Sequence, residues 1–498
     1  MTPQKIFFFG LCVIAIIFGV SEVIPEGTRV GEIEIRTPDY RKWIVSDTLK
    51  YRDISAIIAS VDTTEIHFEQ IDFNKTDSIA EEAINTDIEV AAAPVANARS
   101  NFNTTIISNV TNIRLSDDFY PFEYPPGMDT LLYPFFRTVH QNRLVRVLHY
   151  GDSQIEADRI SSTIRNHFQM LYGGRGPGFL PIVPVHDVAI TFQHRVAPGW
   201  KRFSVLDRGI NALVPDRRFG VSGNFVRYEP VNEEDTVAAI GLTPYYGGFR
   251  NARTFTDVRL FYGTAQKPFT AVVFQDTLEN FYTLNNISHT WWRFESPQNS
   301  LDLQLITSDM PDIYGIALDG ERGVAVDNLP LRGSSGLDFS RMDTEQMRQM
   351  LGIMDVELLI LQFGANIVTR FADDHENYSR RFALQLQTLK SLKPGLMIIV
   401  VGVNDISENT PEGYVTRNNV ENIRNAQKKA AFEAGCVFWD LFESMGGQNS
   451  MPSWVFAEPP LAQTDFMHFT PRGARIVGEL FCKAWTWEHQ KFNQKMSK

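Results

Sequence analysis

The chain has 498 residues, of which 43% are hydrophobic and 21% charged, a composition typical of a soluble globular protein with more than one domain. Its formal net charge of −12 argues against nucleic acid as the main partner, because binding to phosphates requires a basic surface. The charge does not exclude a neutral or sugar-rich polymer as the substrate.

An apolar run near the N-terminus, residues 6–20, follows Lys5 and has the length of a secretory signal rather than of a full membrane span. Gly19 and Ser21 are small enough for cleavage after Ser21, but no A-x-A site is present, so an uncleaved anchor is the alternative. We expect residues 1–21 to be a signal peptide or a signal-anchor, and the protein to be exported to the periplasm or the cell envelope.

Residues 22–112 are expected to form an extension or linker. Within them, the segment 91–98 (Ala-Ala-Ala-Pro-Val-Ala-Asn-Ala) has low complexity, and two short runs, 31–35 and 64–68, resemble strands. A tether between a membrane and a folded domain would have this composition.

Two cysteines follow this segment, Cys436 and Cys482, and both stand in apolar surroundings. We expect buried free thiols rather than a disulfide. The sequence has no Cys/His cluster with the spacing of metal ligands, so neither a metal nor another cofactor is expected.

The first compact unit begins with the apolar run 144–150, followed by Gly-Asp-Ser-Gln at 151–154 and a helix-like stretch, 155–171. The position of Ser153, between a buried strand and a helix, is where an α/β hydrolase exposes its nucleophile. The turn lifts the hydroxyl clear, and the helix N-terminus offers amide donors. Gly-Asp-Ser is also a common turn and helix cap, so the tripeptide alone is a weak signal.

Between about 183 and 323 the pattern changes to short alternating runs separated by Gly, Pro, Asn and Asp, for example at 257–262 and 269–274. This spacing predicts a β-sandwich-like domain inserted into the α/β unit. Paired aromatic residues at 291–292 and 245–246 are candidates for stacking on sugars, and packing within the sandwich is an equally good explanation.

From residue 324 onward, strand-like and helix-like stretches alternate again. Three runs have the composition of buried strands: 358–363, 397–402 and 436–441. This alternation predicts a parallel sheet covered by helices on both faces. We expect this α/β domain to be discontinuous and to comprise residues 113–182 and 324–490, with the β domain, 183–323, inserted between them.

Four strand ends of the predicted sheet carry residues suited to acyl transfer, and ligands bind at the carboxyl ends of strands in open parallel sheets. Ser153 needs a base, and His468 can take its proton while Asp465 holds the imidazole tautomer. The oxyanion needs preorganised donors. The candidates are the backbone N–H groups of Ser153 and Gly333 and the side-chain amide of Asn366.

The serine, glycine, asparagine and histidine blocks, in this order, resemble the SGNH/GDSL hydrolase family. The resemblance implies a three-layer α/β/α domain with Ser153, Asp465 and His468 as the catalytic residues. It also places Gly333 and Asn366 in the oxyanion hole, together with the serine N–H. The long insertion between the serine and glycine blocks, and the run Gly-Asp-Ser-Gln-Ile-Glu-Ala-Asp-Arg-Ile, are similar to bacterial peptidoglycan O-acetylesterases of this family.

The sequence departs from the family pattern in the serine and asparagine blocks. Gln154 stands where the name-giving motif has leucine, and an isoleucine rather than the common aspartate follows Asn366. Gly336, and less strongly Gly223, compete with Gly333 for the glycine position.

Three further residues are candidates for lining the pocket: Asp152, Arg175 and Asn404. For Arg175, a solvated charge on a glycine-rich loop is the simpler interpretation.

The sequence therefore predicts an exported serine esterase that removes O-acetyl groups from a cell-envelope glycan, with peptidoglycan as the first choice. The same Ser-His-Asp site would serve a glycan O-acetyltransferase, and a non-catalytic glycan-binding envelope protein is the third hypothesis. An acetylated polysaccharide is the expected partner, and the sequence predicts no oligomeric state.

Overall fold

The structure, a computed structural model, describes residues 51–61 and 119–497 together with two residue pairs near the N-terminus, 29–30 and 33–34. Short gaps within the long range fall at 186–189, 233–236, 246, 276–277, 285–288, 308 and 371–374. The expected signal or anchor segment, 1–21, lies outside the described residues. None of the helices in these ranges combines the length and the apolar character that a membrane span requires.

Five parallel strands form the central sheet, in the order β15-β3-β16-β17-β20. Their bounds are β3 (Leu144–Gly151), β15 (Gly323–Pro330), β16 (Val356–Gln362), β17 (Met397–Val401) and β20 (Val437–Trp439). The strands are rich in Val, Ile and Leu because both faces of the sheet are buried. Because β15 lies on one side of β3 and β16 on the other, the strand order reverses at β3, and a crevice opens there at the carboxyl ends.

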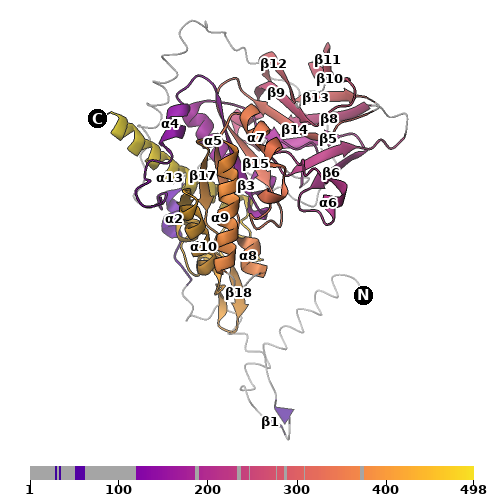
Figure 1. The fold of residues 1–498 in the computed structure, drawn as a ribbon. Coiled ribbons are helices and arrows are strands. Elements are labelled where there is room, and N and C mark those ends of the chain that lie inside the picture. The colour runs from indigo at the N-terminus through magenta and orange to yellow at the C-terminus, as the bar shows by residue number, and fades with distance from the viewer. Residues whose placement is uncertain are drawn as a thin grey trace, which may run out of the picture.

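Alternate residues of each strand point to opposite faces of the sheet, and each face has its own hydrophobic core. In β16, Leu359 and Leu361 belong to one core, whereas Leu358 and Ile360 belong to the other. The first core is covered by α7 (Thr344–Ile353), α9 (His375–Leu392) and α10 (Val420–Glu433). The second is covered by α4 (Tyr133–Thr138), α5 (Ser161–Tyr172) and α13 (Pro471–Met496). The predicted three-layer α/β/α domain is confirmed (Figure 1).

Two antiparallel sheets, inserted between α5 and β15, face each other across a third core. The first has the order β11-β10-β13-β8-β5, and the second has the order β12-β9-β14-β7-β6, with β4 paired to β14. Their bounds are β4 (Gly178–Leu180), β5 (Phe192–Val196), β6 (Trp200–Ser204), β7 (Asn224–Tyr228), β8 (Val237–Pro244), β9 (Phe255–Tyr262), β10 (Phe269–Gln275), β11 (Leu278–Leu284), β12 (His289–Gln298), β13 (Leu301–Ile306) and β14 (Ile313–Asp319). The predicted β-sandwich-like insertion is therefore present.

The remaining elements are short. They are β1 (Arg29–Val30), β2 (Ile33–Glu34), α2 (Ser55–Ser60), η3 (Ser153–Asp158), α6 (Ile210–Leu213), η4 (Arg250–Arg253), η5 (Phe339–Arg341), α8 (Ala365–Arg370), β18 (Ser407–Thr410), β19 (Gly413–Thr416), α11 (Leu441–Ser444) and α12 (Ser450–Val455). As predicted, Cys436 and Cys482 are buried free thiols.

Buried ion pairs join the insertion to the central sheet. Arg146 of β3 donates to Asp327 of β15 at 2.6 Å and also to Asp319 of β14, and all three side chains are almost completely buried. Strand β4 lies before the expected domain boundary at 183, yet it pairs with β14 of the insertion. At their junction, the two parts of the chain are therefore joined by strand pairing and by buried ion pairs.

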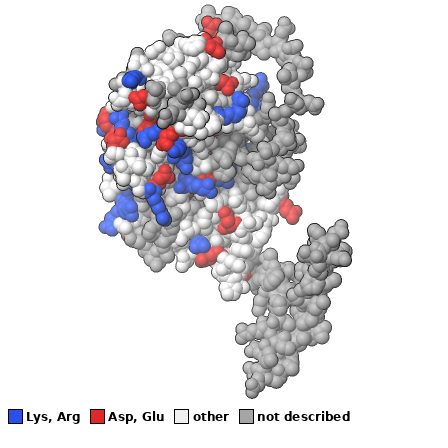
Figure 2. Space-filling model, turned by 90° about the vertical axis from the view of Figure 1, so that its right-hand side faces the viewer, with Lys and Arg blue, Asp and Glu red and all other residues white. Residues whose placement is uncertain are grey.

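The outer face of the insertion carries mixed charge. In Figure 2, basic side chains on this face lie among acidic ones. The insertion contains ion pairs with exposed or partly exposed side chains, such as Arg195 with Asp302 at 3.3 Å and Arg227 with Asp312 at 2.8 Å. Such a face does not offer the continuous basic surface that a nucleic acid needs.

The paired aromatic residues of the insertion divide between its core and its surface. Trp292 is buried in the core, whereas Trp291 is 49% exposed and has the Arg293 guanidinium over its ring. Tyr246 lies outside the described residues.

Part of the expected linker is packed against the α/β domain. Ile54 and Val61, which flank α2, are buried in the same core as α13. The Tyr51 ring lies 5.9 Å from the ring of Phe456, and the Arg52 N–H donates to the carbonyl of Asn449. Residues 51–61 thus belong to the folded body.

Candidate active site

Ser153 lies at the tight turn where β3 leaves the sheet. Gly151 allows the close approach of two backbones there, because a Cβ at this position would lie 2.8 Å from the carbonyl oxygen of Gln362. The Asp152 side chain then caps η3, accepting the Gln154 N–H at 3.0 Å. The strand, turn and cap fix the backbone of Ser153 in the manner of a nucleophile elbow.

The segment after the nucleophile holds two non-glycine residues in the left-handed region, Ala157 (φ 58°) and Asp158 (φ 64°). A bidentate ion pair between Asp158 and Arg165, with bonds of 2.6 and 3.0 Å, stabilises this conformation, and Thr191 of the insertion also donates to Asp158. Strained backbone of this kind clusters at functional sites.

The histidine loop precedes α13 and is organised by Asp465. One carboxylate oxygen of Asp465 accepts the N–H groups of Met467 and His468, each at 3.0 Å. The other oxygen lies 2.7 Å from Nδ1 of His468. Burial alone would raise the pKa of Asp465, but the hydrogen bonds from His468 and Met467 outweigh it and lower the pKa below its usual value.

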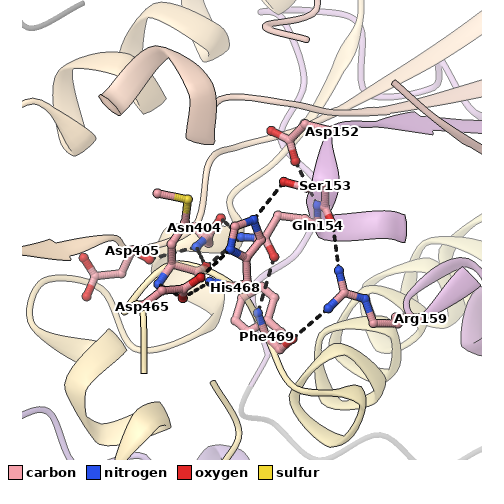
Figure 3. A network of polar contacts seen from close by, with 10 residues as sticks. Asp152, Ser153, Gln154, Arg159, Asn404, Asp405, Asp465, His468 and Phe469 are labelled. Atoms are coloured by element: carbon pink, nitrogen blue, oxygen red, sulfur yellow. Dashed lines mark hydrogen bonds and ion pairs between the residues drawn. The ribbon is translucent and has the colours of Figure 1, made fainter. Parts of the chain in front are cut away.

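The structure brings together three of the predicted residues in a hydrogen-bonded line. Ser153 Oγ lies 2.8 Å from Nε2 of His468, although the two residues are 315 positions apart, and His468 in turn contacts Asp465 (Figure 3). Because Nδ1 of His468 donates to the carboxylate, Nε2 is left as the acceptor for the serine proton.

Gly333 lies in an open turn behind β15, with φ at +84°, and a Cβ there would meet nothing within 4 Å. The two competing glycines serve packing instead. A Cβ at Gly336 would lie 2.9 Å from the Phe382 ring, and one at Gly223 would lie 3.0 Å from the side chain of Leu331. Of the three glycines, Gly333 is the one at which an added Cβ would meet open space.

The Gly333 turn is tied to the nucleophile and to Asn366. Leu331 donates its N–H to the carbonyl of Gly151 at 2.7 Å, and the Asn366 amide donates to the carbonyl of Ser334 at 3.0 Å. A primary amide has two N–H donors, so Asn366 retains one for a ligand.

A cleft of about 500 Å³ opens over Ser153. It is lined by Ser153, Glu156, Ala157, Arg159, Ile190, Arg332, Gln463, Asp465, His468 and Pro471. The buried Glu156 carboxylate lies 3.4 Å from Nε of Arg332, which is largely exposed beside Gly333. The cleft therefore offers charged and polar groups next to the nucleophile.

Neither Gly333 nor Asn366 is among these lining residues, and the three candidate pocket residues also lie outside them. Asp152 is buried beneath the nucleophile, and burial raises its pKa to about 6 although the Gln154 N–H opposes the shift. Asn404 is buried behind the histidine loop, where it donates to the carbonyl of Met467 at 3.0 Å. Arg175 lies against Gly320, at the turn between β14 and β15. Asp152 and Asn404 are therefore kept out of the cleft by burial, whereas Arg175 lies at a different turn of the fold.

Sequence reasoning missed Glu156, Arg159 and Arg332 in the cleft, and also the contacts of Gln154. Glu156 and Arg159 stand in the run that follows Ser153, but that run does not show that their distant partners are Arg332 and Phe469. Among the described residues, no group of three or more His, Cys, Asp or Glu side chains could hold a metal ion.

The sequence matches no protein-family model and no curated protein. A solved structure described as a peptidoglycan O-acetylesterase in action superposes with a TM-score of 0.57 at 18% identity, covering 73% of this chain and 97% of that one. A crystal structure of the acetyl xylan esterase AlAXEase has a TM-score of 0.25 at 14% identity, covering 32% of this chain and 79% of that one, which is too low to carry an argument. The first likeness shows the fold alone: the three-layer α/β/α domain with an inserted β domain is an architecture that this chain shares with that structure over 73% of its length.

Proposed function

We propose that the protein is an exported serine esterase that removes O-acetyl groups from a cell-envelope glycan, with peptidoglycan as the substrate. The observation that carries the proposal is the line from Ser153 Oγ to His468 and Asp465, with contacts of 2.8 and 2.7 Å, at the floor of an open cleft. The choice of substrate is supported by the fold shared with a peptidoglycan O-acetylesterase over 97% of that chain.

The reaction begins when Ser153 Oγ attacks the acetyl carbonyl carbon and its proton passes to Nε2 of His468. The tetrahedral intermediate collapses as the imidazolium returns this proton to the departing sugar oxygen, which leaves an acetyl-serine. Water then attacks the acetyl carbonyl and gives a proton to His468. Acetate departs, and the serine recovers its proton. Asp465 keeps its charge throughout and stabilises the imidazolium.

The oxyanion would be held by the Ser153 and Gly333 N–H groups and by the second amide N–H of Asn366. The Leu331 to Gly151 bond of 2.7 Å joins the Gly333 turn to the nucleophile strand, which supports the assignment of donors from both segments. Donors fixed before the reaction stabilise charge without reorganisation.

The proposal is tested by measuring acetate release from O-acetylated peptidoglycan. Ser153→Ala should lower the rate by roughly 10⁴- to 10⁶-fold, because the nucleophile acts as a unit with its base. The matched control is Ser162→Ala. Ser162 is a buried serine of α5 whose hydroxyl has no partner among the described residues, so this variant should retain the wild-type rate. Undiminished release by Ser153→Ala would contradict the mechanism.

Hydrolysis is favoured over acetyl transfer because the site is accessible to water, with the Asp465 side chain 45% and the His468 side chain 24% exposed. Adding a glycan acceptor to the assay should leave the yield of free acetate unchanged. Loss of acetate to an acetylated acceptor would instead identify a transferase.

Export is tested on protein recovered from the cell envelope. Mass spectrometry of its N-terminal peptide should show either cleavage after Ser21 or an intact apolar run in the membrane fraction. Recovery of the full chain from the cytoplasm would contradict export.

A further inference from the structure

Both neighbours of His468 in the sequence are held by a side chain from the nucleophile turn. The Gln154 amide nitrogen donates to the carbonyl of Met467 at 2.7 Å. Its amide oxygen accepts the N–H of Phe469 at 3.4 Å. Gln154 lies between the nucleophile turn and the histidine loop (Figure 3), and its side chain is only 2% exposed.

Arg159 makes a second connection between the same two segments. Its guanidinium donates to the carbonyl of Ser153 at 2.6 Å, to that of Glu156 at 3.0 Å and to that of Phe469 at 3.1 Å. One rigid planar group thus joins the nucleophile to the residue after the base. Because three carbonyls engage it, Arg159 supports the backbone although it borders the cleft.

Asn404 completes the network from the loop that follows β17. It donates to the Met467 carbonyl at 3.0 Å, and its side-chain oxygen accepts from the Gln154 amide at 3.1 Å. The carbonyl before His468 is therefore held by two amides that also bind each other.

We propose that Gln154 is a positioning residue, which together with Arg159 and Asn404 sets the distance between the nucleophile and its base. Asp465 cannot do this, because it belongs to the same loop as His468 and moves with it. The bonds from Gln154 and Arg159 run instead from the serine side to the histidine side. This inference rests on the proposed function, since it assigns a task within the same site.

Leucine, the residue of the name-giving motif, is the informative replacement at position 154. Gln154→Leu keeps a side chain of similar size but removes both the donor and the acceptor. A misplacement of about 1 Å can cost on the order of 10²-fold in rate. We expect kcat per active site to fall by roughly 10- to 100-fold with KM unchanged, because Gln154 does not line the cleft.

Gln154→Glu supplies a pH-dependent version of the same test. It keeps an acceptor for Phe469, but when ionised it faces the Met467 carbonyl and the Asn404 oxygen without a proton to donate. Its rate, divided by the wild-type rate at the same pH, should therefore recover as the pH is lowered and the new carboxyl group is protonated. The same ratio for Gln154→Leu should not change with pH.

The matched control is Gln346→Leu in α7, far from the cleft. Gln346 is also buried and accepts the N–H of Gly220 at 2.8 Å, so the substitution makes the same chemical change elsewhere. It should lower the melting temperature but leave kcat unchanged. Titration of Ser153 with a fluorophosphonate counts active sites, so a smaller folded fraction does not lower the kcat calculated per active site.

The labelling rate with the fluorophosphonate also separates this inference from the proposed function, because it requires the nucleophile and base but no glycan. Slower labelling of Gln154→Leu than of wild type and Gln346→Leu supports positioning. Equal labelling rates of Gln154→Leu and wild type, or a kcat per active site within about twofold, would overturn it. Failure of wild-type Ser153 to be labelled would instead refute the proposed function.

Discussion

The residue that precedes the nucleophile carries a buried charge. One oxygen of the Asp152 carboxylate accepts the Gln154 N–H, and the other has no partner among the described residues. Burial raises its pKa to about 6, against the opposing influence of the Gln154 N–H and of His468. A carboxyl group whose pKa is raised on folding stabilises the protein while it is protonated. That stability is lost as the pH rises through about 6.

Replacing Asp152 by asparagine should remove this pH-dependent contribution to the stability of the protein. The difference in melting temperature, Asp152→Asn minus wild type, should increase between about pH 4 and pH 7, because only the wild type must ionise a buried carboxyl group. Asp405, whose pKa burial also raises to about 6, is present in both proteins, so the difference isolates Asp152. Melting curves that differ by a constant amount across this range would contradict the assignment.

At the scale of elements, α2 shows how a short segment is held by tertiary contacts. Ile54 and Val61 anchor its two ends in the core beside α13, and Tyr51 contacts Phe456. The Phe456 ring lies 5.7 Å from the ring of Phe466, within the loop that carries Asp465 and His468. A six-residue helix is too short to be stable by itself, so its order depends on these anchors.

Ile54→Ala combined with Val61→Ala should therefore detach the segment. We expect limited proteolysis to cleave within residues 51–61 much faster than in wild type, while the α/β domain stays intact. Ser55→Ala, an exposed position in the same helix, is the control and should leave the cleavage rate unchanged. Equal protection of the double variant and wild type would show that the anchors are unimportant.

The elements that could be predicted from the sequence are those with a local pattern. The apolar runs at 358–363 and 397–402 are β16 and β17, because strands buried on both faces must be continuously hydrophobic. The position of Ser153 followed from the same reasoning, since a buried strand and a turn precede it. The helix expected over 155–171 begins only at Ser161, because η3 and the left-handed residues Ala157 and Asp158 come first. The docking of α2 could not be predicted, because its 51–61 segment finds its partners only in the folded protein.

The residues of the candidate site likewise divide into those with a local sequence pattern and those whose contacts form only in the folded protein. Ser153, Asp465 and His468 carry recognisable motifs and come together in the structure. The contacts of Gln154 and Arg159 with the histidine loop span more than 300 positions and leave no local pattern. These contacts form only when α13, which follows the histidine loop, packs on the sheet that contains β3.

At the scale of the whole molecule, Arg146 joins the two parts of the fold. It lies between Asp327 of the central sheet and Asp319 of the insertion, and all three are shielded from water. The two carboxylates repel each other, and the positive charge of the Arg146 guanidinium offsets this repulsion. A buried charge left without its partner is strongly destabilising.

Arg146→Leu should consequently lower the free energy of unfolding by about 3–5 kcal/mol, as measured by denaturant titration. Arg195→Leu breaks an ion pair with Asp302 on the exposed face of the insertion and should leave the free energy nearly unchanged. Similar losses for the two variants would argue that the buried network does not hold the insertion in place.

The acetyl-serine intermediate is tested by locating the acetyl group during turnover. The enzyme is mixed with an activated acetyl ester, quenched rapidly with acid and digested, and the acetylated peptide is identified by mass spectrometry. We expect acetylation of Ser153 in the wild type and its loss in His468→Ala. Acetylation of a different residue, or acetate release at the wild-type rate by a Ser153→Ala enzyme, would contradict it.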